Sequence, residues 1–137
     1  MTSLRRFTTA PTIEEFEAIA ARAFDTIPEE LRRHVGNVVI QVEEFPDEET
    51  EQEMKLESPF DILGLYRGIG LPFQSMTQPH PEPEMIYLYR RPILDYWCET
   101  GEELTDVIRH VLIHEIGHHF GFSDDDMEAL EQQAEED

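Results

Sequence analysis

The sequence predicts an α+β domain in which a small mixed or antiparallel sheet packs on a backing helix and on a second helix near the carboxyl end. Apolar residues recur at helical spacing over 13–27 and again over about 100–120. Between these segments lie three short runs with strand character, at 38–45, 62–66 and 85–90. Two amphipathic helices around three short strands therefore indicate a single α+β core.

One domain is expected, because a chain of 137 residues is long enough for a single hydrophobic core. We assign residues 12–137 to it and residues 1–11, which are polar and mildly basic, to a flexible N-terminus. Thr12 and Glu15 have the spacing of a capping box, which predicts the start of the first helix. Pro28 follows that helix and is expected to start a short helical turn.

Two stretches are expected to lack regular structure. Residues 46–53 are acidic and start with a proline, so they have too little apolar area to order themselves, and we expect a mobile loop. Residues 72–84 contain four prolines and are expected to form a partly extended loop. Pro92 follows the third strand run closely, which indicates an edge strand or a strand end at 85–90.

The charge limits the classes of partner. Asp and Glu total 31 against 10 Lys and Arg, a net charge of −21, which repels nucleic acid and anionic membrane surfaces but tolerates basic or unfolded polypeptides. No apolar run approaches the roughly 18 residues of a membrane span, and no secretory signal is visible. The only cysteine, Cys98, has no partner for an internal disulfide. We therefore expect a cytoplasmic protein, and the sequence does not indicate its oligomeric state.

A metal-binding pattern, His114-Glu115-x-x-His118, lies within the second helix. Residues four apart share one helix face, so His114 and His118 can offer two imidazole nitrogens to one metal ion. Glu115 is one step round the helix, where it can reach a water molecule without being a ligand. This combination is typical of zinc-dependent hydrolysis with glutamate as the general base.

A third ligand is expected shortly after the helix. Gly121 is placed to end the helix in the left-handed conformation and to turn the chain back, which can bring Asp124 to the metal. Asp124 is also a good N-cap for a last helix, which would give it a purely structural role. The alternatives to Asp124 as third ligand are an added water molecule, Asp125 and Asp126.

The remaining histidines are given other roles. His110 lies one turn before His114, and we interpret it as a supporting or surface residue rather than a ligand. His119 is rotated roughly 100° from His118, towards the core, which predicts packing or a hydrogen bond. His80 lies in the proline-rich loop.

The extended pattern His114-Glu115-x-x-His118-x-x-Gly121-x-x-Asp124 resembles the metzincin type of zincin motif, with aspartate where most of that group have a third histidine. The run 114–124 resembles the small bacterial zincin-like metallopeptidase family, and the stretches 62–68 and 85–94 support the match. The resemblance covers about residues 12–130. It implies a minimal zincin fold and a Zn²⁺ cofactor, and it assigns to strand 85–90 the backbone pairing of an extended substrate.

These observations predict a zinc-dependent metallopeptidase-like hydrolase that cleaves small or unfolded polypeptides. Zn²⁺ bound by His114, His118 and Asp124 would activate a water molecule, with Glu115 as the base. Two alternatives remain open: a zinc-containing peptide- or protein-binding module without proteolysis, and a latent protease whose site is covered by residues 72–84. The tyrosine candidates for stabilising the oxyanion are Tyr66, Tyr87, Tyr89 and Tyr96.

Overall fold

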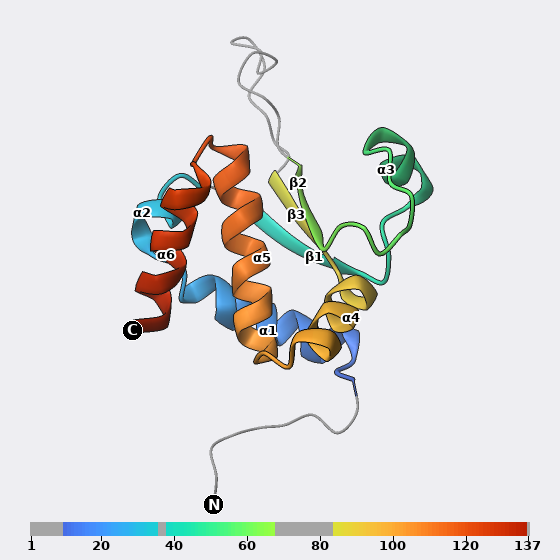
Figure 1. The fold of residues 1–137 in the computed structure, drawn as a ribbon, viewed down its shortest axis with the longest axis horizontal. Helices are drawn as coiled ribbons and strands as arrows, with labels where there is room; N and C mark the ends of the chain where they lie inside the picture. Colours follow the sequence, from blue (N-terminus) through green and yellow to red (C-terminus); the bar gives the residue numbers. More distant parts are fainter. Residues whose placement is uncertain (1–9, 36–37, 68–83, 137) are drawn as a thin grey trace, which may run out of the picture.

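The computed structural model describes residues 10–35, 38–67 and 84–136 and confirms the α+β class (Figure 1). Six helices and three strands occur in the described part of the chain, and none of these helices is long and apolar enough to cross a membrane. In chain order the elements are α1 (Ile13–Asp25), α2 (Glu29–Arg32), β1 (Val38–Glu43), α3 (Glu48–Glu53), β2 (Gly64–Arg67), β3 (Glu84–Tyr89), α4 (Arg90–Thr100), α5 (Leu104–His119) and α6 (Asp124–Glu136).

The sheet is mixed and has the order β1-β3-β2, with β1 parallel and β2 antiparallel to β3. Strand β3 is therefore central, so the edge-strand alternative for 85–90 is wrong. The other alternative, a strand end before Pro92, is confirmed, because β3 ends at Tyr89 and α4 begins at Arg90. Pro92 lies in the first turn of α4, where a missing N–H group costs no helical hydrogen bond. No proline falls within β3 itself, so both of its sides can pair.

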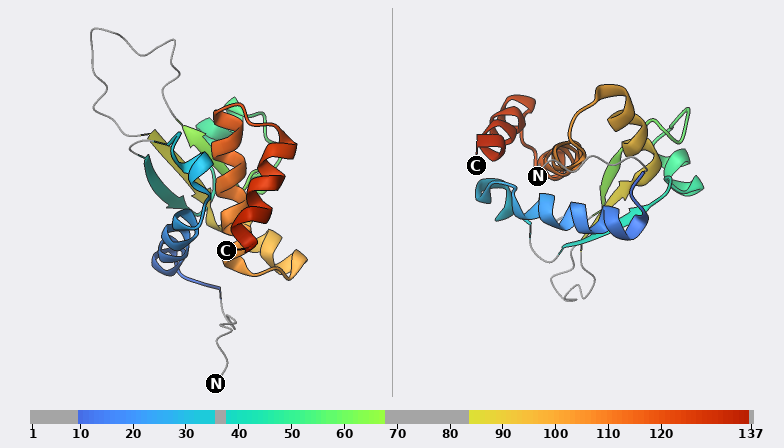
Figure 2. Two further views of the ribbon diagram at one scale, coloured as in Figure 1. Left: turned by 90° about the vertical axis from the view of Figure 1, so that its left-hand side faces the viewer. Right: turned by 90° about the horizontal axis from the view of Figure 1, so that it is seen from below.

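One face of the sheet is buried. The register aligns Ile40, Ile86 and Tyr66 in one row across the three strands, and Ile86 and Tyr66 are buried. Helix α1 packs against β1 and α5, and α5 packs against β2 and β3 (Figures 1 and 2). Side chains alternate between the two faces of a strand, and the buried ones form one core cluster with the buried residues of α1 and α5. Both helices therefore cover the same face of the sheet, as the sequence predicts.

The start of the domain is fixed by two sets of hydrogen bonds. The Thr12 hydroxyl accepts from the Glu15 N–H at 3.1 Å, and the Glu15 carboxylate accepts from the Thr12 N–H at 2.8 Å, so the capping box is confirmed. Arg90 donates to the Pro11 carbonyl from Nε at 2.8 Å and from Nη2 at 2.6 Å. Of the predicted flexible segment 1–11, residues 1–9 lie outside the described residues.

The acidic run 46–53 is not a loop, and that prediction is wrong. It contains α3, whose N-cap residue Asp47 accepts a hydrogen bond from the Thr50 N–H at 2.7 Å. Carboxylates in a first turn are favoured by the helix dipole. Arg67 of β2 donates to Thr50 Oγ1 at 3.2 Å and pairs with Glu53 at 2.8 Å. The contacts with Arg67 therefore stabilise α3, although the segment itself has few apolar residues to bury.

Helix α4 was not predicted from the sequence. It follows β3 directly and ends at Gly101, whose φ of 71° is in the left-handed region that glycine tolerates best. Helix α5 consequently begins at Leu104, a few residues later than the start near residue 100 that the helical spacing predicts.

Helix α6 contacts α5 closely at Gly117. A Cβ atom at this position would lie 2.3 Å from the Met127 Sδ atom and 2.7 Å from its Cγ atom. Met127 is completely buried, so a Cβ atom at position 117 would force its side chain to shift within the core. The absence of a side chain at Gly117 therefore sets the distance between the two helices.

Gly117→Ala should lower the free energy of unfolding by about 1–3 kcal/mol through overpacking, although alanine is the better helix former. Met127→Ala alone should cost about 2–5 kcal/mol. Met127→Ala removes the atoms that clash with the new Cβ atom. The loss in free energy of unfolding of the double variant should therefore be smaller, by at least about 1 kcal/mol, than the sum of the losses of the two single variants. Urea unfolding of the four proteins measures this coupling, and additive losses would contradict the close contact.

Candidate metal centre

Three histidines form a stripe along α5, because His110, His114 and His118 are spaced four residues apart. The ring centroids of His110 and His114 are 4.2 Å apart, and those of His114 and His118 are 5.7 Å apart. The His118 side chain, near the end of the helix, is 58% exposed, and that of His114 is 30% exposed. The stripe faces solvent and the following helix, α6.

The turn after α5 has the geometry that Gly121 predicts. Gly121 has a φ of 81°, its N–H donates to the His118 carbonyl at 3.2 Å, and the Phe122 N–H donates to the Gly117 carbonyl at 2.8 Å. This pair of bonds is the Schellman motif, which ends a helix and reverses the chain. Helix α6 therefore runs back beside α5 (Figure 1).

Asp124 is the first residue of α6 and lies beside the last histidine of the stripe. Its Oδ1 atom is 3.7 Å from His118 Nε2, and its side chain is 90% exposed. The cap of α6 is Ser123, which exchanges hydrogen bonds with Asp126 at 3.1 and 3.3 Å. The N-cap role that was considered for Asp124 thus belongs to Ser123, and the Asp126 carboxylate accepts a hydrogen bond from the Ser123 N–H group.

Glu115 lies between strand β2 and the last histidine of the stripe, because both the Tyr66 backbone and His118 act on its carboxylate. Its half-buried carboxylate accepts a hydrogen bond from the backbone N–H of Tyr66 in β2. Burial raises the pKa of Glu115 to about 7, while the positive charge of His118 and the Tyr66 N–H act in the opposite direction. Glu115 is thus a carboxyl group that can exchange a proton near neutral pH.

The edge position of β2 makes the Tyr66 N–H available to Glu115. The Tyr89 N–H donates to the Leu63 carbonyl at 2.9 Å. In an antiparallel ladder, residues alternate between facing the partner strand and facing away from it. Leu63 faces β3, so Tyr66, three residues later, faces away from it, and its N–H group is not used in the pairing of the two strands. The sheet edge next to Glu115 is therefore β2 and not β3.

Tyr66 also links the sheet to the end of α5 through its side chain. Its hydroxyl donates to Glu84 Oε1 at 2.7 Å, and its ring stacks on His119 with centroids 4.0 Å apart. His119 Nε2 lies 3.8 Å from Glu84 Oε2. The prediction of a packing role for His119 is confirmed, and the Tyr66 hydroxyl is already committed to a carboxylate.

The other tyrosines considered as oxyanion donors lie elsewhere. Tyr87 and Tyr89 line a hollow of about 340 Å³ together with Asp47 and Arg67 of the α3 region. Tyr96 of α4 is hydrogen-bonded to Glu102, and its pKa is raised by burial and by the charges of nearby carboxylates, Glu102 first and Glu131 second. His80 lies outside the described residues.

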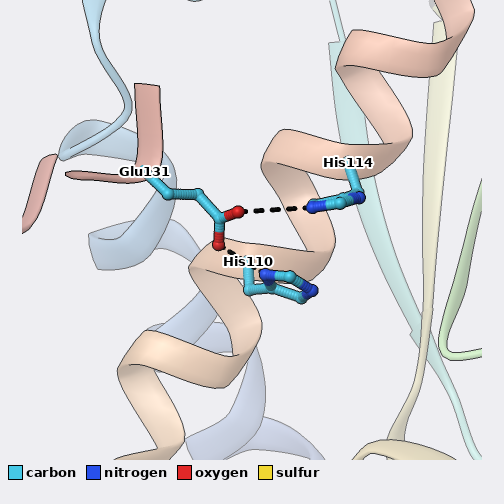
Figure 3. Close-up of side chains that lie close together, drawn as sticks. All are labelled: His110, His114 and Glu131. Carbon is cyan, nitrogen blue, oxygen red and sulfur yellow. Dashed lines mark hydrogen bonds and ion pairs between the residues drawn. The ribbon is translucent and has the colours of Figure 1, made fainter. Parts of the chain in front are cut away.

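A carboxylate that the sequence analysis did not consider joins the histidine stripe (Figure 3). Glu131 of α6 places Oε2 at 3.2 Å from His114 Nε2 and bonds His110 Nδ1 through Oε1. In the described part of the chain, one group of three metal-ligating side chains already has its donor atoms within 4.8 Å of one another: His110, His114 and Glu131. Its only signal in the sequence is the seven-residue spacing from Asp124, which places both carboxylates on one face of α6.

These donors fit a divalent metal such as zinc. Imidazole nitrogen and carboxylate oxygen are both zinc ligands, and a tetrahedral ion with bonds of 2.0–2.2 Å sets ligand atoms roughly 3.3–3.6 Å apart. The pair His118 and Asp124, at 3.7 Å, is close to that spacing. His114 must turn its Nε2 atom from Glu131 to join them, so the motif ligands are adjacent but not fully assembled.

Glu115→Gln should stabilise the metal-free protein at alkaline pH. Because burial raises the pKa of Glu115 from its ordinary value of 4.5 to about 7, the folded state binds more protons than the unfolded state between these values. The stability of the unmodified protein therefore falls as pH rises through this window. Thermal unfolding in EDTA should give the variant and the unmodified protein the same free energy of unfolding below pH 4.5. Above pH 7 the variant should be more stable by on the order of 3 kcal/mol. An equal stability at pH 8 would contradict the raised pKa.

Comparisons with known proteins identify the family of the chain. A search of curated proteins found no match. A family model described as zincin-like metallopeptidase matches residues 14–134, from the first turn of α1 to the last turn of α6. This match includes the histidine stripe, Glu115, the Schellman turn and both carboxylates of α6. The chain belongs to the zincin-like metallopeptidase family.

Proposed function

We propose that this protein is a zinc-dependent peptidase that hydrolyses peptide bonds of small or unfolded polypeptides. In this proposal His114, His118 and Asp124 bind Zn²⁺, and Glu115 is the general base. The observation that carries it is the placement of Glu115. It is a half-buried carboxylate with a raised pKa, one residue from His114 and within electrostatic reach of His118. Membership of the metallopeptidase family supports the reaction class.

In this mechanism His114, His118 and Asp124 would hold the metal, and Glu115, whose carboxylate interacts with His118, would transfer the proton. Zinc, when bound, would polarise the scissile carbonyl and lower the pKa of a water molecule. Glu115 accepts the proton of the attacking water and later donates it to the leaving amine. The Tyr66 N–H holds the carboxylate in place during both transfers. The net charge of −21 favours basic over acidic polypeptides as substrates.

Glu115→Gln should retain zinc but lose hydrolysis, because the amide cannot accept the water proton. A general base contributes roughly 10²–10⁴-fold, so cleavage of unfolded casein should fall by at least about that factor. Bound zinc is measured by atomic absorption and cleavage by peptide release, each with and without a chelator. The matched control is Glu128→Gln, an exposed glutamate on α6, which should cleave as the unmodified protein does.

Two outcomes would count against this assignment. Full activity of the Glu115→Gln variant would exclude Glu115 as the base. Zinc binding without any cleavage by the unmodified protein, together with peptide binding that survives Glu115→Gln, would favour the zinc-containing binding module.

Asp124→Ala and Asp125→Ala form a matched pair that tests the third ligand. Both residues are exposed aspartates in the first turn of α6, but only Asp124 is paired with His118 in the structure. Asp124→Ala should weaken zinc binding at least roughly tenfold, since even residues that only support ligands cost 10–100-fold, and should abolish cleavage. Asp125→Ala should change neither. Titration calorimetry with ZnCl₂ gives the affinities, and the reverse pattern would assign the role to Asp125.

A further inference from the structure

We propose that His110, His114 and Glu131 form a second binding position for a divalent cation, zinc in the first instance. It lies one helical turn before the motif position and shares His114 with it. Its existence is independent of the proposed function, whereas its effect on catalysis rests on that function.

The first argument is the donor set. Glu131 presents Oε2 to His114 Nε2 at 3.2 Å and Oε1 to His110 Nδ1, so one carboxylate spans two imidazoles (Figure 3). Two imidazoles and one carboxylate are also the ligands expected at the motif position, and three protein ligands leave one place for water. The distance of 3.2 Å is close to the separation of two ligand atoms on a tetrahedral ion, roughly 3.3–3.6 Å.

The second argument is access and charge. His110 and Glu131 line a cavity of about 1040 Å³ between the end of α1, α2 and the first turns of α5. A cation can therefore reach them from solvent without passing the motif position. Carboxylates outnumber the two arginines of the cavity wall, Arg32 and Arg109, of which Arg109 is paired with Asp106. The excess of negative charge raises the local concentration of cations. The carboxylates are Asp25, Glu29, Glu102, Glu103 and Asp106.

The shared histidine makes the two positions alternatives. His114 Nε2 points at Glu131 in the structure, and the same atom cannot bind two ions at once. When an ion occupies the second position, His114 is not available to bind an ion together with His118 and Asp124. Such an ion also lies towards His110, whereas Glu115 interacts with His118 at the other end of the stripe. The protein loaded in this way would hold metal without placing it near the general base. The second position is thus a resting site for the ion.

The test removes the motif ligands and leaves the second set intact. His118 and Asp124 have exposed side chains, so the double variant His118→Ala/Asp124→Ala should fold normally, which circular dichroism verifies. After treatment with EDTA and dialysis, titration calorimetry with ZnCl₂ should show one equivalent of bound zinc. Its affinity should be weaker than that of the unmodified protein, because the motif position is lost.

A third substitution then identifies the ligands. Glu131→Gln or His110→Ala in the double-variant background should weaken zinc binding at least roughly tenfold further. Glu128→Gln, which removes the same charge from the same helix, should not. An anomalous difference map of the double variant at the zinc edge should place the ion between His110, His114 and Glu131.

Two results would overturn the proposal. Absence of zinc binding by the double variant would show that the cluster is only a hydrogen-bonded contact between α5 and α6. Binding that Glu131→Gln and Glu128→Gln weaken equally would show that zinc is held by the acidic surface. Neither result depends on catalysis, so the peptidase assignment is judged separately by the Glu115→Gln variant.

Discussion

The close contact of α6 with α5 at Gly117 is the constraint on which the metal centre depends. With no side chain at this position, Met127 packs directly on the α5 backbone, and the next turns of α6 lie against the histidine stripe. The Schellman turn at Gly121 fixes the direction in which α6 returns. A wider helix spacing would move Asp124 from His118 and Glu131 from His114, and would leave the histidines of α5 without carboxylate partners.

Helix α5 separates two chemical environments. On the side of α6, the imidazoles and carboxylates are partly exposed and can exchange ions with solvent. On the side of β2, the Glu115 carboxylate is half-buried and hydrogen-bonded to the sheet backbone, and its burial holds its pKa near 7. Residues that are adjacent in the sequence thereby lie in different surroundings, since consecutive positions on a helix point about 100° apart.

Strand β2 has a larger part in this arrangement than its four residues suggest. A Cβ atom at Gly64 would lie 2.9 Å from both the Tyr87 carbonyl oxygen and Val111 Cγ1, so glycine permits α5 to approach the sheet there. Two residues later, the outward N–H of Tyr66 holds Glu115, and the Tyr66 side chain contacts Glu84 and His119. The same strand therefore positions the general base proposed for the reaction, and its hydrogen bond acts against the rise in pKa that burial causes.

The sequence by itself determined the features that depend on local patterns. The capping box at Thr12, the stripe of α1, the strand runs and the left-handed Gly121 were predictable, because periodicity and backbone preference act over a few residues. Tertiary structure decided the features that depend on partners far along the chain. Strand β3 is central because β1 and β2 both pair with it. Helix α3 is ordered through its contacts with Arg67. Glu131 contacts His110 and His114 because α6 packs against α5. Such contacts leave no local pattern, since they join residues whose separation in the sequence says nothing about their distance in the fold.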